Sequence, residues 1–597
     1  MLSRSLAIAP SLLTLSVGCA MPELPQDAGD PADSTGASDS AGELDTDTDT
    51  ESAQEASTCI QQVAAVEGLL RERCSGCHDN GQTNGGLGGI GDADLLIENG
   101  YILRGDADGS PLYKQVESKT MPLTGEPLAE SELTLLREWI SSCTSAADDP
   151  ADLSLAEPPA CPDNLPVPAK NILAAIRDDV VLLDNARAKT TRYLTLAHLY
   201  GAGYCEAQIE GYRHALNKLL NHLSHSPHIR APEPIDADRT IYRINLTDYG
   251  WTTATWKAIT DSDPYAVVFE SEDALDIRES ADVDLFSVKA DWFLDAASQP
   301  PLYYTILQLP DNRFDLEASL GLNVDANIAT ELDQNTDDVV RAGFQISNVS
   351  FSNRVIERHQ QPSSPNRAYW LSYDFAKAKQ GEQLPPFKNI LENPLDFVED
   401  GGEIIFNLPN GLQAYMLVNN KGERIDRGPI GIVHDKETPE EPEVINGVSC
   451  MSCHSEGMRS ATDEVGIFVA GNTDFDELAQ EQVARLYAPA DVFARKLAQD
   501  IETFADAMAL TGAPRRVGNN EPVMAAHLAF AGALDLRRAA AEFGVPETEV
   551  LKHVSQLVGL ATIAGATVTR DVFQDNFAAN ACVLNLGASA ACPLEPK

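Results

Sequence analysis

A short cysteine–histidine motif occurs twice in this chain of 597 residues. The first copy is Cys74-Ser75-Gly76-Cys77-His78 and the second is Cys450-Met451-Ser452-Cys453-His454. The spacing C-x-x-C-H attaches a c-type haem, because its two thiols reach the vinyl groups of one porphyrin and the adjacent imidazole meets the iron. A bare C-x-x-C would suit a zinc half-site or a thioredoxin-like redox pair, but neither explains the repeated histidine. We therefore expect two covalently attached c-type haems, with attachment at Cys74, Cys77, Cys450 and Cys453 and with His78 and His454 as axial ligands.

The N-terminus has the pattern of an export signal. Arg4 supplies a positive charge, Leu6 to Val17 is apolar, and Gly18-Cys19 offers a cleavage point. The segment resembles a bacterial lipoprotein signal, which implies that Cys19 is lipidated, although Ser16 stands where leucine is usual. No later apolar run of about 18 residues follows, so we expect membrane contact through an N-terminal lipid only. The expected location is that of an exported, membrane-tethered lipoprotein in the periplasm or on the outer membrane, which suits c-type haem because it is attached outside the cytoplasm.

The remaining cysteines suggest disulfides. Of the 11 cysteines, one is the lipidation candidate and four belong to the haem motifs, which leaves an even number. An oxidising compartment favours disulfide pairing of such a set. The expected pairs are Cys59 with Cys143, Cys161 with Cys205, and Cys582 with Cys592, although a sequence alone does not determine connectivity.

The charge of the chain limits its partners. It has 43 basic and 91 acidic residues, a formal net charge of -48. Such a surface repels phosphate backbones, so nucleic acid is not an expected partner. Redox protein partners are expected, and an acidic surface would attract basic ones, although solubility is the simpler explanation of the charge.

Length and composition divide the chain into several expected parts. The segment 20–58 contains no lysine or arginine and too few apolar residues to fold. The expected order is a signal peptide at 1–19, an acidic disordered tether at 20–58, a cytochrome c domain at 59–146 and a linker at 147–160. An α+β domain of unknown role follows at 161–444, and the second haem motif with a helical C-terminal region occupies 445–597. The expected fold class is α+β multidomain, with a small all-α class I-like domain before a larger α+β region.

Helical patterns flank the first motif. Apolar residues on one helical face lead into Cys74, namely Ile60, Val63, Val66, Leu69 and Leu70. A loop containing Met121 follows, and Ser131 is placed to cap a helix that extends to Ile140. Helix, haem motif, methionine loop and helix in this order are the layout of a small class I cytochrome.

These residues together resemble a known family. The order C-x-x-C-H, Gly-Gly-Leu, Ser-x-Leu, Met-Pro and Leu-Arg-x-Trp-Ile is similar to that of the planctomycete-type single-haem cytochrome c domain. The resemblance covers 59–146 and implies that His78 is the proximal ligand and Met121 the distal one. The loop reads Met-Pro-Leu where the family often has Met-Pro-Pro. Histidine and methionine ligation leaves no open iron position, which implies electron transfer and no bond-making chemistry at this haem.

Beyond the linker the periodicity predicts mixed secondary structure. Helices are expected over 171–186 and 190–223, and a strand-like pattern over 235–246. β-Structure is expected at 343–352 and as a meander over 404–425, where Asn-Gly and Lys-Gly turns separate the strands. From Thr473 to Phe577 the chain is expected to be mostly helical, including 526–543 and 547–558.

The distal ligand of the second haem is not apparent from the sequence. Met416, His434, Met458, Met508, Met524 and His527 are alternatives, and the iron could also be five-coordinate. His222, His225 and His228 invite a metal-site interpretation, but Pro227 interrupts the helix on which they would align. A polar helix end is therefore the expected role of these histidines.

Three functions compete on this basis. The favoured one is an exported dihaem c-type cytochrome that transfers electrons between periplasmic or surface redox partners. One alternative is a dihaem enzyme of the peroxidase or oxygenase type with an open second haem. The other is a partner- or glycan-binding protein in which the haems are accessory. No catalytic residue is assigned.

Overall fold

The computed structural model describes residues 164–344, 353–375, 389–428, 443–517 and 520–588, Cys592, and a discontinuous set between Val66 and Cys143. Contacts divide the chain into two units, one of residues 1–79 and 89–143 and one of residues 80–88 and 144–597. Within the described ranges, no helix has both the length and the apolar character needed to cross a bilayer.

The described part of the first unit is helical. It contains α3 (Pro111–Glu117), α4 (Glu130–Glu138) and a short π-helical turn η2 (Trp139–Cys143). Its buried side chains include Val66, Leu70, Leu112, Leu136, Trp139 and Ile140. The predicted cap at Ser131 is wrong, because α4 begins at Glu130 and its N-cap is Ala129, two residues before the predicted one. Glu132 explains the shift, since its carboxylate accepts a hydrogen bond from the Ala129 backbone N–H at 2.6 Å.

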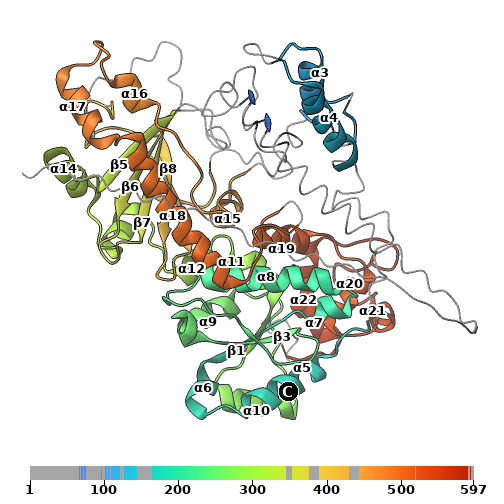
Figure 1. Cartoon of the computed structure of the whole chain (residues 1–597). Helices are drawn as coiled ribbons and strands as arrows, with labels where there is room; N and C mark the ends of the chain where they lie inside the picture. Colours follow the sequence, from blue (N-terminus) through green and yellow to red (C-terminus); the bar gives the residue numbers. More distant parts are fainter. Residues whose placement is uncertain are drawn as a thin grey trace, which may run out of the picture. The chain divides into compact units, whose positions relative to one another are not determined.

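The second unit begins with helices around a four-stranded sheet of order β2-β3-β1-β4 (Figure 1). The strands are β1 (Thr191–Thr195), β2 (Glu233–Pro234), β3 (Ile241–Asn245) and β4 (Ser287–Lys289). Strand β1 pairs antiparallel with β3 and parallel with β4. The first helices are α5 (Ala169–Val180), α6 (Asn185–Thr190), α7 (Ala197–Gly201) and α8 (Glu206–His222).

The structure corrects both helices predicted in this region. The segment 190–223 contains the strand β1 before its helices, because all five residues of β1 are buried between two neighbouring strands. Ladder pairing thus overrides the local helical pattern of a short segment. The predicted helix 171–186 ends at Val180, and Asp184 starts α6 by accepting hydrogen bonds from two backbone N–H groups.

A six-stranded antiparallel sheet of order β10-β9-β8-β7-β6-β5 follows. Its strands are β5 (Val339–Phe344), β6 (Asn353–Gln360), β7 (Ala368–Phe375), β8 (Gly401–Asn407), β9 (Gln413–Asn419) and β10 (Arg424–Ile425). The meander predicted over 404–425 is confirmed as β8, β9 and β10. Between β3 and β4 the chain forms η5 (Leu246–Tyr249), α9 (Thr253–Asp261) and α10 (Glu272–Ala281). Between β4 and β5 it forms α11 (Ala290–Ala297), α12 (Leu302–Leu307), α13 (Arg313–Ser319) and α14 (Val324–Gln334).

The rest of the described chain is helical. It comprises α15 (Val448–Cys453), α16 (Val465–Val469), α17 (Glu477–Leu486), α18 (Ala490–Thr511), α19 (Pro522–Ala531), α20 (Leu536–Phe543), α21 (Glu547–His553) and α22 (Arg570–Val583). The helix predicted over 526–543 is two helices, because Asp535 caps a new start after Gly532. Helix α21 ends at His553, five residues before the predicted end. A mixed α+β fold with a helical C-terminal part is therefore confirmed.

The regions 161–444 and 445–597 share one hydrophobic core. Helix α18 runs along the six-stranded sheet (Figure 1), where the Asp500 carboxylate accepts hydrogen bonds from Arg358 and Trp370. Helix α19 packs on α8 and α11, and α20 packs on α7. One continuous cluster of buried side chains joins residues of both regions.

The Cys582–Cys592 disulfide predicted from the sequence is present, with a Cα–Cα distance of 5.4 Å. Cys205 is also disulfide-bonded, as predicted. Its predicted partner Cys161 and the predicted pair Cys59–Cys143 lie outside the described side chains.

Candidate functional site

The second cysteine–histidine motif begins at a tight backbone turn. Gly447 precedes α15 with φ of +93°, and a Cβ atom there would lie 2.3 Å from the Ser298 carbonyl oxygen. Only glycine tolerates both conditions. The Ser449 hydroxyl then accepts a hydrogen bond from the Ile445 backbone N–H at 3.0 Å, which anchors the first turn of the helix.

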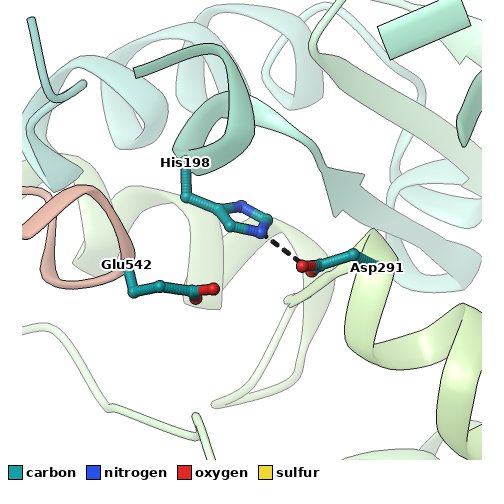
Figure 2. A group of neighbouring side chains, drawn as sticks. All are labelled: His198, Asp291 and Glu542. Carbon is teal, nitrogen blue, oxygen red and sulfur yellow. Dashed lines mark hydrogen bonds and ion pairs between the residues drawn. The ribbon is translucent and has the colours of Figure 1, made fainter. Parts of the chain in front are cut away.

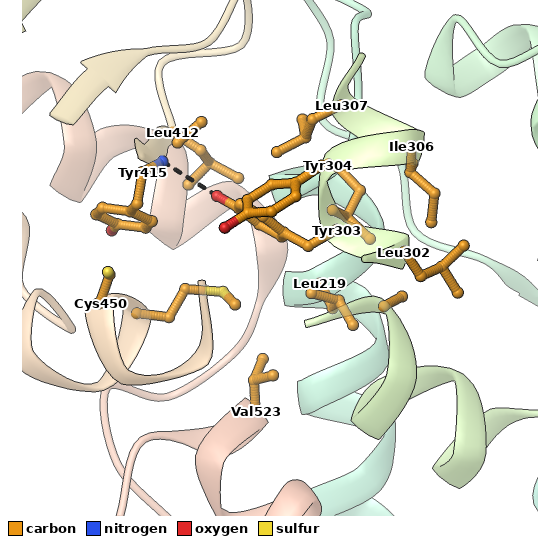
Figure 3. Packing of buried hydrophobic residues seen from close by; sticks show 14 of the residues in the cluster. Leu219, Leu302, Tyr303, Tyr304, Ile306, Leu307, Leu412, Tyr415, Cys450 and Val523 are labelled. Carbon is orange, nitrogen blue, oxygen red and sulfur yellow. Dashed lines mark hydrogen bonds between the residues drawn. The ribbon is translucent and has the colours of Figure 1, made fainter. Parts of the chain in front are cut away.

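Cys450 lies inside the hydrophobic core, as Figure 3 shows, with Tyr415 of β9 beside it. Its thiol is 3.8 Å from the Asn446 side-chain oxygen. Burial raises the pKa of this thiol well above its ordinary value, so it is neutral. The hydroxyl of Tyr303 in α12 accepts a hydrogen bond from the Tyr415 backbone N–H at 3.1 Å, which helps to hold Tyr415 in place beside Cys450. Cys453, one helical turn later, is partly exposed.

His454 follows α15 and is held in one tautomer. Its Nδ1–H donates to the Gly457 carbonyl oxygen at 3.0 Å, and a carbonyl can only accept. The lone pair is therefore on Nε2, which lies 3.8 Å from a Glu403 carboxylate oxygen. The Tyr415 ring packs beside the imidazole with a centroid distance of 5.9 Å. An imidazole with Nδ1–H on a carbonyl and a lone pair on Nε2 is prepared to ligate a metal.

Glu403 places a negative charge next to this nitrogen. Glu403 lies near the buried Arg354 guanidinium, whose positive charge favours the ionised carboxylate. The residues of the second motif thus fit a c-type haem: two thiols one helical turn apart and an imidazole with Nε2 available. Cys450, Cys453 and His454 would hold the group.

The first motif is described only in part. Cys74 and Met121 are both partly buried, and His78 and Cys77 lie outside the described residues. Met121 lies four residues beyond the end of α3, and its backbone N–H donates to the Gln115 carbonyl oxygen at 3.0 Å. In the described part of the chain, the buried Trp139 Nε1–H has no hydrogen-bond partner.

The alternatives for a distal ligand of the second haem have packing roles. The large core cluster contains Met416 of β9, Met508 of α18, and Met458, which lies between α15 and α16. Met524 of α19 is buried in a smaller cluster. His527 binds the Asp295 carboxylate at 2.7 Å through Nδ1. His434 lies outside the described residues. We assign no distal ligand to the second haem.

The three histidines at 222–228 do not converge. His222 donates from Nδ1 to the Gln413 carbonyl oxygen at 3.1 Å, and His225 donates from Nε2 to the Ile306 carbonyl oxygen at 3.0 Å. His228 is beyond the end of α8, which stops at His222. The expected structural role thus fits their contacts.

A buried charge cluster was missed by the sequence analysis (Figure 2). His198 of α7 donates from Nε2 to Asp291 of α11 at 2.8 Å, and Glu542 of α20 approaches the same pair. One ligand atom from each of the three side chains lies within 4.8 Å of the others. Lys289 and Arg570 both pair with the Glu542 carboxylate, the latter at 2.9 Å.

The charges of this cluster stabilise one another. Burial opposes ionisation of Asp291, but His198 lowers the pKa of Asp291 below its usual range. Likewise, Lys289, His198 and Arg570 overcome burial and lower the pKa of Glu542 far below normal. Among the residues described, no group binds Nδ1 of His198 or Oδ2 of Asp291, so the cluster retains hydrogen-bonding capacity.

Topology explains why these residues meet. His198 and Asp291 each follow the carboxyl end of a strand, β1 and β4, and these strands are parallel neighbours. The carboxyl ends of parallel strands share one edge of a sheet, where ligand sites often lie. Recognition of β1 and β4 as a parallel pair would have revealed the dyad, but β4 has only three residues.

No protein-family model, no curated protein and no solved structure matches the chain.

Proposed function

We propose that the protein is an exported dihaem c-type cytochrome that transfers electrons between periplasmic or surface redox partners. The observation that carries this proposal is the buried His454, held by a carbonyl through Nδ1 directly after Cys450 and Cys453. A dithiol redox pair requires no imidazole in that state, whereas a metal ligand does, and the C-x-x-C-H spacing favours haem iron as that metal. The resemblance of 59–146 to a single-haem cytochrome domain supports the same function for Cys74, Cys77, His78 and Met121.

In this function the chain would bind and orient the redox group. When bound, a haem supplies reversible one-electron oxidation and reduction. Cys450 and Cys453 would tether it, and the Gly457 carbonyl would keep His454 oriented. The core packing of Tyr415 and Tyr303 around Cys450 keeps water from this side of the motif.

The test is the intact mass and absorption spectrum of the protein purified from a host that attaches c-type haem. We expect a mass increase equal to two haems and a c-type spectrum in the reduced protein. The double variant Cys450→Ser/Cys453→Ser should lose one haem, whereas Cys582→Ser should retain both, because it removes a cysteine outside the motifs. A colourless protein, or one heavier by a single haem, would contradict the proposal.

A ligand test distinguishes electron transfer from enzyme activity. Two low-spin haems whose spectra ignore added cyanide and peroxide are expected for a carrier. A high-spin second haem that turns over peroxide would favour the dihaem enzyme instead.

For location, we propose a lipid anchor at Cys19, so Cys19→Ala should release the protein from membranes.

A further inference from the structure

A cavity lies beside the buried charge cluster in the second unit. Its volume is about 130 Å³, and its walls come from the four-stranded sheet, α5, residues 265–269 and the C-terminal helices α20 and α22. The apolar part of the wall includes Leu173, Val267, Phe269, Phe286, Phe543 and Phe577. The polar part is formed by His198, Asp263, Lys289 and Glu542. An apolar pocket with a few convergent polar groups is the usual form of a small-molecule site.

The size of the cavity limits its ligand. A cavity of about 150 Å³ lined by aliphatic and aromatic side chains admits benzene. The cavity here is similar in volume and in the character of its apolar wall. A single six-membered ring with one small substituent is therefore about the largest molecule that fits.

The polar end carries charges of both signs. Lys289 donates to the Glu542 carbonyl oxygen at 2.8 Å and lies 4.4 Å from the centre of the Tyr265 ring. Asp263 accepts a hydrogen bond from the Tyr265 backbone N–H at 2.8 Å and stays partly exposed. An anionic ligand would meet the ionised Glu542, and a cationic ligand would meet Lys289. A neutral group that donates one hydrogen bond and accepts another is repelled neither by the carboxylate nor by the ammonium group.

We propose that this cavity binds a small neutral molecule composed of one apolar ring and one hydroxyl group. The ring packs on the phenylalanine wall. The hydroxyl accepts from the Lys289 ammonium and donates to the Asp263 carboxyl group. This binding site is independent of the haem motifs.

A divalent metal is the competing occupant, because His198, Asp291 and Glu542 have suitable ligand atoms. Both carboxylate oxygens of Glu542 are, however, occupied by permanent cations, Oε2 by Lys289 and Oε1 by Arg570 at 2.9 Å. A metal would have to displace these cations from a buried site, which costs free energy. The observations therefore favour the neutral ligand.

The test is isothermal titration of the full purified protein with matched probes. Phenol should bind with a stoichiometry of one, and toluene, which lacks the hydroxyl, at least about tenfold more weakly, because phenol makes two hydrogen bonds that are each worth up to roughly that factor. Benzoate and benzylamine should bind more weakly than phenol. Equal affinity for phenol and toluene, or no phenol binding, would overturn the proposal. Binding of Zn²⁺ without phenol binding would also overturn it in favour of a metal site.

Two variants locate the binding. Ala266→Phe fills the cavity and should abolish phenol binding, whereas the control Ala254→Phe on the exposed face of α9 should leave it unchanged. Asp263→Leu removes the hydroxyl's acceptor, so the preference of phenol over toluene should shrink to what the Lys289 hydrogen bond alone provides, while toluene still binds. If Asp263→Leu bound phenol and toluene with the same ratio of affinities as the unmodified protein, the role of Asp263 as hydrogen-bond acceptor would be contradicted. This result would count even if Ala266→Phe failed to fold.

Discussion

His454 is oriented by one backbone carbonyl and faces one carboxylate. The Gly457 carbonyl selects the tautomer, and Glu403 adds a negative charge 3.8 Å from Nε2. A buried negative charge near a redox centre stabilises its more positive, oxidised form. At the scale of single residues, Glu403 is therefore a determinant of the redox potential in the proposed function.

We expect Glu403→Gln to raise the midpoint potential of the second haem, on the order of tens of millivolts, because the variant removes the charge and keeps the shape. Spectroelectrochemical titration measures this change. Glu392→Gln, on an exposed part of the chain, is the matched control and should leave both potentials unchanged. A potential that falls or stays constant in Glu403→Gln would contradict the argument.

Asp263 should make the stability of the protein depend on pH. Burial raises the pKa of Asp263 to about 7 in the folded protein, whereas an unfolded aspartate titrates near about 3.9. The folded state thus binds the proton more tightly, so this group lowers stability progressively as pH rises from about 4 to about 7. Asp263→Asn stays neutral and should raise the melting temperature more at pH 8 than at pH 5. Equal gains at both pH values would refute this origin.

At the scale of elements, the disulfide closes the wall of the cavity. It joins the end of α22 to Cys592, ten residues further along the chain. The enclosed loop carries Ala588, which exchanges two backbone hydrogen bonds with Val268, at 2.8 and 2.9 Å. This pairing holds the C-terminal segment against the strand-like residues 267–269 that line the cavity.

We expect Cys582→Ser to lower the free energy of unfolding by about 2–3 kcal/mol, because opening a loop of this length restores chain entropy to the unfolded state. Urea unfolding measures the loss, and hydrogen exchange should show faster opening at Val268 and Ala588. Cys592→Ser should have the same effect, since both variants remove the same bond. Clearly different losses would show that the loss is not due to the disulfide.

The turn before α15 sets the start of the helix that carries the second cysteine–histidine motif. Gly447→Ala would combine a left-handed conformation with a clash against the Ser298 carbonyl oxygen. We expect a marked loss of stability and reduced occupancy of the second haem, measured by thermal unfolding and by haem content per protein. The control Gly471→Ala has a similar φ of +74° but no atom within 4 Å of the added Cβ. It should cost only about 1–2 kcal/mol of strain. Equal effects would contradict the role of the clash.

At the scale of the whole molecule, the net charge of -48 dominates long-range interactions. Attraction between oppositely charged proteins accelerates their encounter and is screened by salt. Under the proposed function, electron exchange with a small basic redox protein should therefore slow by about tenfold or more between low and high ionic strength. Stopped-flow absorbance measures the rate. An acidic redox protein should show the opposite trend, and a rate independent of salt would exclude steering by this charge.

Local patterns account for the elements that the sequence predicted well. The β8–β10 meander is set by turns at Asn410-Gly411 and around Lys421-Gly422, and the C-terminal helices follow from apolar repeats and caps such as Asp535. Strand β1 was mistaken for helix because its five residues are all buried and show no alternation. The start of α4 was misplaced by two residues because Glu132, and not Ser131, provides the hydrogen bond at the start of the helix.

Features that depend on residues a few positions apart could be predicted from the sequence. They are the two C-x-x-C-H motifs, the turns, the helix repeats and the short Cys582–Cys592 loop. Only the tertiary structure decided the rest. His198 meets Asp291 across 93 residues and Lys289 meets Glu542 across 253, because parallel strands and a returning C-terminal helix bring them together. The physical reason is that such contacts depend on the packing of the whole core, to which no local spacing is a guide.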